Sequence, residues 1–256
     1  MKEAGCQSLR KVNIVSLGVH VTDVVSAART VVDWAERGAS AIVCVATVHM
    51  VMTAWDDDEY REVVERADLV VPDGMPLAWG QRALGSTLAQ RVCGEDLTKE
   101  ILAYAARSDI AVGFYGGDPV TLRDLVQTVR SRWPGVKVRY AVSPEFGPAR
   151  PLTEREARAV QESGVRVLFV GLGCPKQERW MALNHEKAGC VLIGVGAAFD
   201  FLSGHKRRPS KWWQALGLEW LYRMFAEPRR LFWRYAYNNP RFIALFLLQW
   251  TRSRFV

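Results

Sequence analysis

The chain has 256 residues, of which 49% are hydrophobic and 24% charged, enough apolar material for the core of a folded, soluble-type protein. Its five cysteines form no CxxC pair and have no histidine spacing suited to zinc, which argues against a disulfide framework and suits reduced thiols in a cytosol. No run of about 18 uninterrupted apolar residues marks a spanning helix, and residues 1–10 lack the apolar core of a signal peptide. We therefore expect neither secretion nor a bilayer-spanning anchor.

Short β-branched apolar runs alternate with segments of helical periodicity over residues 1–205. The expected strands are residues 12–17, 41–45, 69–71, 110–115, 136–140, 165–170 and 191–195. The expected helices are residues 21–37, 54–67, 97–107, 119–133, 153–163 and 175–187. This alternation is typical of βαβ units. It predicts an α/β domain over residues 1–205, Rossmann-like, with a mostly parallel sheet.

The C-terminal segment, residues 206–256, has a different character. It holds two lysines and nine arginines against two glutamates, a net charge of +9, which leaves −2 for residues 1–205. Five of the ten tryptophans lie among these arginines. Such a mixture indicates a membrane interface or a nucleic acid, and the apolar run at residues 242–248 favours the membrane. We expect a helical, basic and aromatic membrane-docking appendage, and no nucleic-acid partner.

Three expected strands end in glycine turns, at residues 115–119, 171–175 and 194–196. Ligands of open α/β sheets bind beyond the carboxyl ends of the strands, where glycine admits a close backbone approach and helix N-termini present N–H groups to phosphate. A phosphorylated ligand is therefore favoured. None of the turns has the full GxGxxG fingerprint or a Walker A motif, so each one alone is as compatible with a simple tight turn.

A carboxylate follows the expected strand at residues 69–71, in the sequence Pro72-Asp73-Gly74. There it faces the same crevice as the glycine turns, which makes Asp73 a candidate general base. The local sequence by itself favours an Asx turn before Gly74. The neighbouring glycine turns are what argue for a catalytic role.

Basic and amide side chains offer further contacts to phosphate. Pro175 suits a first helical turn, which places Lys176 and Gln177 at a helix N-terminus, although Lys176 is equally an ordinary surface lysine. In the appendage, Arg223 and Arg230 are seven residues apart and are expected to share one helical face, with Arg234 one turn later. Such a row could clamp a diphosphate or simply face solvent or lipid.

No metal site is predicted. The triplet at residues 56–58, all aspartate, imitates the acidic motif of metal-dependent sugar transferases, but acids at the start of a helix complement its dipole. The histidines have no mutual spacing that suggests a metal site or a nucleophile–base pair; they are His20, His49, His185 and His205.

Five sequence blocks, taken together and in order, resemble the WecG/TagA/CpsF family, which belongs to glycosyltransferase family 26. They are PDG at residues 72–74, RVCGEDL at 91–97, VGLGCPKQE at 170–178, GVGAAFDF at 194–201 and EWLYR at 219–223. The resemblance covers nearly the whole chain, and the PKQE and EWLYR blocks are the most specific.

The resemblance implies an inverting, metal-independent glycosyltransferase without a cofactor. The donor would be a UDP-sugar, typically UDP-N-acetylmannosamine or its uronic acid, and the acceptor an undecaprenyl-diphosphate-linked sugar of bacterial polysaccharide synthesis. The enzyme would be cytoplasmic and peripheral on the cytoplasmic face of the inner membrane. Residues 1–205 would be the catalytic domain and residues 206–256 the membrane-associating appendage.

The family pattern also implies roles for individual residues. Asp73 would deprotonate the acceptor hydroxyl, Arg91 and Gln177 would contact the donor or the developing charge, and Arg223 and Arg230 would complete the site from the appendage. The other residues expected to bind substrate are Thr47, Asp96, Gly171, Gly173, Lys176, Gly196 and Asp200.

Departures from the family pattern leave the donor sugar open. Many members carry Thr-x-Asn upstream of Pro-Asp-Gly, whereas this chain has Thr47 followed by His49 and Met50, so a hexose donor is an alternative. Ala197 replaces an expected glycine, and Trp233 stands where a further arginine is expected. A Rossmann-type oxidoreductase and a non-catalytic adaptor are the rival functions, and a homo-oligomer stays open.

Overall fold

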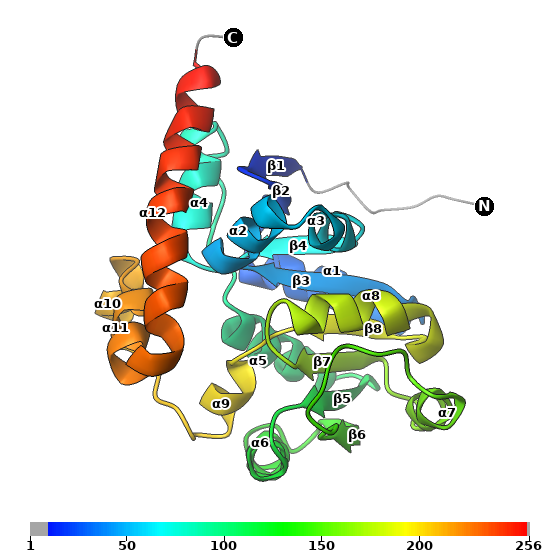
Figure 1. Ribbon diagram of the computed structural model, residues 1–256. Helices are drawn as coiled ribbons and strands as arrows, with labels where there is room; N and C mark the ends of the chain where they lie inside the picture. The colour runs from blue at the N-terminus through cyan, green and yellow to red at the C-terminus, as the bar shows by residue number, and fades with distance from the viewer. Residues whose placement is uncertain (1–9, 255–256) are drawn as a thin grey trace, which may run out of the picture.

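The structure is a computed structural model that describes residues 10–254 (Figure 1). Its centre is a six-stranded sheet whose neighbouring strands are all parallel. In spatial order the strands are β4 (Leu69–Pro72), β3 (Ala41–Ala46), β8 (Val191–Gly194), β7 (Val167–Gly171), β5 (Ala111–Gly116) and β6 (Lys137–Val142). The α/β fold with a mostly parallel sheet, expected from the sequence, is confirmed.

Helices cover both faces of this sheet, which explains why its inner strands are apolar on both sides. All six residues of β3 are buried, for example, with Ile42 and Cys44 in one core and Val43 and Val45 in the other. The first core lies beneath α2 (Val48–Asp56), α3 (Asp58–Glu65), α7 (Glu154–Glu162) and α8 (Lys176–Ala188). The second lies beneath α1 (Val24–Glu36), α5 (Gly94–Ala105), α6 (Pro119–Arg132) and α9 (Ala198–Leu202).

The first expected strand, residues 12–17, forms an antiparallel hairpin instead of joining the parallel sheet. β1 (Lys11–Ile14) and β2 (Leu17–His20) pair across a turn in which Val15 has a φ of 59°. In β1 buried and exposed residues alternate, the pattern of a strand with one face in the core. The hairpin therefore covers the edge of the first core.

The helix expected at residues 54–67 is two helices. Asp57 has extended backbone angles, φ −141° and ψ 101°, and its side chain accepts a hydrogen bond from the Tyr60 N–H at 2.9 Å, so it ends α2 and caps α3. The preceding helix begins earlier than expected because Thr47 caps it through the Met50 N–H. A further helix, α4 (Met75–Ala83), follows β4 and was not expected.

The appendage is helical, as expected, and packs on the α/β domain. It consists of α10 (Lys211–Ala215), α11 (Glu219–Ala226) and α12 (Pro228–Arg252), and α12 lies along α2 (Figure 1). Phe242 is buried, Arg241 pairs with both carboxylate oxygens of Asp56, and Gln249 bonds to the backbone of the β1–β2 hairpin. Within residues 10–254, no helix combines the length and apolarity that crossing a bilayer requires.

Candidate active site

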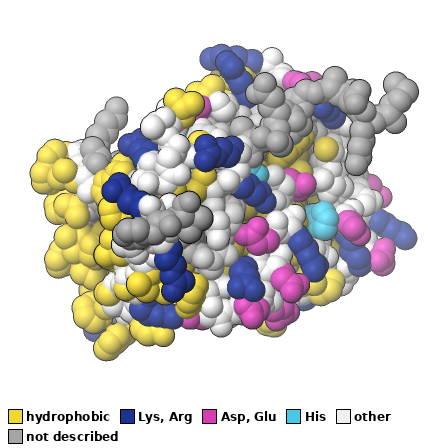
Figure 2. Space-filling view, turned by 90° about the horizontal axis from the view of Figure 1, so that it is seen from above, with side chains coloured by type: hydrophobic (Ala, Val, Ile, Leu, Met, Phe, Trp, Pro, Cys, Tyr) yellow, Lys and Arg dark blue, Asp and Glu magenta, His cyan; other side chains and the backbone are white. Residues whose placement is uncertain are grey.

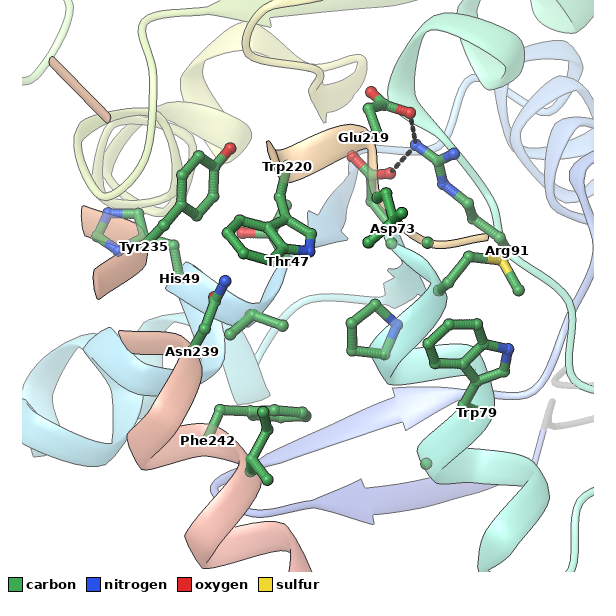
Figure 3. Close-up of a pocket in the computed structure, with 18 of the residues that line it drawn as sticks. Thr47, His49, Asp73, Trp79, Arg91, Glu219, Trp220, Tyr235, Asn239 and Phe242 are labelled. Carbon is green, nitrogen blue, oxygen red and sulfur yellow. Dashed lines mark hydrogen bonds and ion pairs between the residues drawn. The ribbon is translucent and has the colours of Figure 1, made fainter. Parts of the chain in front are cut away.

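A cavity of about 520 Å³ lies where the carboxyl ends of β3 and β4 face α11 and α12 (Figure 3). Four residues expected from the sequence line it: Thr47, Asp73, Arg91 and Arg223. The sheet positions them, because the carboxyl ends of parallel strands meet at one edge. After β3 the chain enters α2, on the side of the first core, whereas after the neighbouring β8 it enters α9, on the side of the second core. Two neighbouring strands that lead to opposite faces of a sheet form a topological switch point, which is the usual place for a ligand in such sheets. This switch point lies beside the cavity.

The loop after β4 presents Asp73 to the cavity. The Asp73 N–H donates to the Ala46 carbonyl at 2.7 Å, and Gly74 then turns the chain into α4 with a φ of 104°, which side chains rarely adopt. The Asp73 side chain is 23% exposed. Burial raises the pKa of this carboxyl, Arg91 opposes the shift, and Glu219 adds to it. A carboxylate with a raised pKa at the wall of a cavity suits a general base.

Arg91 meets Asp73 because its own segment is fastened to β4. The Val92 N–H donates to the Pro72 carbonyl at 2.8 Å, which brings the two side chains together. The Arg91 Nη2 lies 3.3 Å from Asp73 Oδ1 and 2.7 Å from Glu219 Oε2 (Figure 3). Glu219 is thus a site residue that sequence reasoning missed, although it opens the EWLYR block.

His49 is a second missed residue at the cavity wall. Burial, with the positive charge of Arg234, lowers the pKa of His49 from 6.5 to about 4, so the imidazole is neutral at neutral pH. Asn238 of α12 places its amide nitrogen 3.2 Å from His49 Nδ1. An amide nitrogen only donates, which leaves the proton of the neutral ring on Nε2. His49 is therefore a hydrogen-bond donor in the wall of the cavity.

The predicted shared helical face of Arg223 and Arg230 is wrong. The helix breaks at Glu227, with φ −135° and ψ 61°, and Pro228 starts α12 in a new direction. Arg223 lines the cavity, whereas Arg230 is outside its lining, half exposed and paired with Glu227 at 2.7 Å. Arg234, which follows on α12, lines the cavity in its place.

A protein-family model described as the glycosyl transferase WecG/TagA/CpsF family matches residues 12–255, nearly the whole chain. The chain belongs to the WecG/TagA/CpsF family. The resemblance expected from the sequence blocks is thereby confirmed, and membership implies a glycosyltransferase of cell-envelope polysaccharide synthesis. It favours a transferase over the oxidoreductase and adaptor that the sequence left open.

A second group of expected residues lies at the same sheet edge of this WecG/TagA/CpsF transferase, outside the cavity lining. Gln177 is only 4% exposed; its amide nitrogen donates to Glu178 at 2.7 Å, and its oxygen accepts the Gly196 N–H at 3.1 Å. Gln177 thus braces the turn after β8. A sequence reading could not have found this bond, because it joins residues from different strand ends.

The turn after β7 is shaped by its glycines. A Cβ on Gly171 would lie 2.6 Å from the ring of Phe199, and Gly173 has a φ of 80°. Lys176, at the start of α8, lies over the ring of Phe146 at 5.5 Å. The turn after β7 is therefore a close-packed backbone loop beside a helix N-terminus.

Two expected substrate-binding residues, Asp96 and Asp200, pair instead with the first residues of the appendage. Asp96 accepts two hydrogen bonds from Arg208, at 2.6 and 2.9 Å, and Asp200 pairs with Lys206 at 2.7 Å. Neither carboxylate lines the cavity. In this family member they join the α/β domain to its appendage.

The described residues contain no group of three or more His, Cys, Asp and Glu side chains that could hold a metal ion. The aspartates at residues 56–58 take structural parts, as Asp56 pairs with Arg241 and Asp57 caps α3 and pairs with Arg179. The cavity offers instead three cationic side chains, Arg91, Arg223 and Arg234, together with two carboxylates, Asp73 and Glu219.

Proposed function

We propose that this protein transfers a sugar from a UDP-sugar to a polyprenyl-diphosphate-linked sugar, with inversion and without a metal ion. The observation that carries the proposal is the make-up of the cavity, in which a partly buried carboxylate and arginines lie at one end and apolar side chains at the other. Asp73 and Arg91 mark the charged end, and Trp79 and Phe242 the apolar end (Figure 3).

The apolar end fits a lipid-linked acceptor. Trp79 of α4 and Phe242, Phe246 and Leu247 of α12 line it. Leu247 is also 51% exposed, so the apolar wall continues onto the outside of the molecule. An isoprenoid chain lying there would place its diphosphate near the arginines and its sugar near Asp73, the same order of apolar, anionic and hydroxyl groups that the cavity presents.

In the proposed reaction, the acceptor hydroxyl attacks C1 of the donor sugar while the bond from C1 to the diphosphate breaks. Asp73 takes the hydroxyl proton, and UDP leaves with the bonding electrons, so a single displacement inverts C1. Arg223 and Arg234, which line the cavity, are proposed to stabilise the departing diphosphate. The glycine turns after β7 and β8 are proposed to hold the nucleotide, with Lys176 at the N-terminus of α8.

The outer surface of the appendage supports binding to a membrane surface, which we propose to be the cytoplasmic face of the inner membrane. Apolar side chains gather on the side of the molecule formed by α10–α12, with basic residues among them (Figure 2). The exposed fractions reach 63% for Trp212, 71% for Phe225 and 76% for Trp233. Exposed aromatic residues beside arginines suit the headgroup layer of an anionic membrane.

The test is sugar transfer in the presence of EDTA, from a panel of UDP-sugars that includes N-acetylmannosamine, its uronic acid and hexoses, to a synthetic polyprenyl-diphosphate sugar in vesicles. We expect transfer from one donor, and a loss of at least about 100-fold in Asp73→Asn, which keeps the size of the side chain but removes the base. Transfer that requires added metal, or an active Asp73→Asn protein with native stability, would contradict the mechanism.

A further inference from the structure

The guanidinium of Arg91 lies between one carboxylate of the α/β domain and one of the appendage. A single nitrogen, Nη2, is 2.7 Å from Glu219 Oε2 and 3.3 Å from Asp73 Oδ1. The three side chains are largely buried, with exposed fractions of 14% for Arg91 and Glu219 and 23% for Asp73. The shorter contact makes Glu219 the main partner of the shared nitrogen.

We propose that Glu219 is a positioning residue, which draws Arg91 away from Asp73 and so keeps the catalytic carboxylate free to accept a proton. This inference rests on the proposed function, in which Asp73 is the base. Without Glu219, the same guanidinium could turn both terminal nitrogens to Asp73 in the bidentate geometry that arginine and carboxylate favour. A carboxylate held in that way is a weaker base, because protonation must then break the ion pair.

The charge of Glu219 acts in the same direction. The titratable groups that face Asp73 are Arg91, Cys93, Glu219, Arg223 and Tyr235. Burial is the main reason why the pKa of Asp73 is raised, and the like charge of Glu219 adds to it, while the two arginines lower it. Burial also raises the pKa of Cys93, to about 12, and that of Tyr235, so these two groups are neutral near pH 7. Glu219 is thus the one negative neighbour among these groups.

Glu219 is the first residue of α11, so its contact with Arg91 exists only while the appendage is docked on the α/β domain. In an undocked state Arg91 would have Asp73 as its remaining carboxylate partner in this cluster. Docking would then release the base as well as deliver Arg223 to the cavity. The appendage would switch the reactivity of Asp73, in addition to any part in membrane binding.

The test compares Glu219→Gln, which removes the charge and keeps the shape, with Glu219→Asp, which keeps the charge. Glu227→Gln, in the same appendage but paired with Lys206 and Arg230, is the matched control. Two quantities are measured on each full-length protein: the pKa of Asp73, from carboxyl ¹³C NMR with the signal assigned through Asp73→Asn, and the pH dependence of kcat and KM for transfer.

We expect Glu219→Gln to lower the pKa of Asp73 by about one unit and kcat by about tenfold, with the acid limb of the kcat profile moved to lower pH and little change in KM. Glu219→Asp should restore most of both, and Glu227→Gln should match the wild type. An unchanged Asp73 pKa in folded Glu219→Gln would overturn the proposal, as would a kcat loss without a shift of the acid limb. Wild-type protein without Asp73-dependent transfer would instead refute the proposed function, and the NMR result would still stand on its own.

Discussion

His49 connects the cavity to the pH dependence of stability. Burial, with the charge of Arg234, holds its pKa at about 4 in the folded chain, against 6.5 for an ordinary histidine. Below pH 6.5 His49 is therefore protonated in the unfolded chain but stays neutral in the folded chain. This proton uptake favours the unfolded chain, so the free energy of unfolding is highest above pH 6.5 and falls on acidification. Linkage between these two pKa values gives a loss of about 2 kcal/mol from pH 7 to pH 5.

His49→Asn removes this titration while keeping a polar side chain, so the variant should lose about 2 kcal/mol less than the wild type over the same pH interval. Urea unfolding followed by tryptophan fluorescence at pH 7, 6 and 5 measures the free energy of unfolding of both proteins. His20 is also buried with a lowered pKa, but it is present in both proteins and cancels in the comparison. If the two proteins lose stability in parallel, His49 is not held neutral and the reasoning fails.

Two further predictions concern the appendage. Arg234→Ala should lower kcat/KM for transfer by about 100-fold, because a cation that lines the cavity is lost. Arg230→Ala should change kcat/KM by less than about twofold, because an exposed ion pair contributes little. Equal losses in steady-state kinetics would contradict this assignment. Trp233→Ala should weaken cosedimentation with anionic vesicles by about tenfold, whereas Phe146→Ala, which removes an exposed aromatic ring outside the appendage, should not. Equal binding of both variants to the vesicles would argue against membrane binding through α12.

The sheet could be predicted from the sequence because burial on both faces leaves a local signature. The unbroken apolar run of β3 needs no knowledge of its neighbours to be read as a buried strand. The β1–β2 hairpin was missed because its turn, at Val15 and Ser16, contains neither glycine nor asparagine, the usual signals of a tight turn. The break at Asp57 was missed for a similar reason, since an aspartate cap looks like one more polar residue on a helix.

The candidate site also contains some residues that the sequence could predict and others that it could not. Asp73 and Thr47 follow neighbouring strands, so the rule for strand ends brings them together. Glu219 is 128 residues from Arg91, and Asn238 is 189 residues from His49. No spacing or local pattern relates such pairs; they meet only because α12 packs on α2 and carries the appendage to the sheet edge.

Helix α12 has two surfaces on one continuous helix. Asn239 and Phe242 form cavity wall, while Trp233 and Tyr237 point outward with exposed fractions of 76% and 59%. Because successive residues are set about 100° apart around a helix, inserting or deleting a residue would reorient both surfaces at once. In a chimera between members of this family, the cavity wall and the outer surface of α12 should therefore change together. Exchanging α12 for another member's helix would alter both in one step.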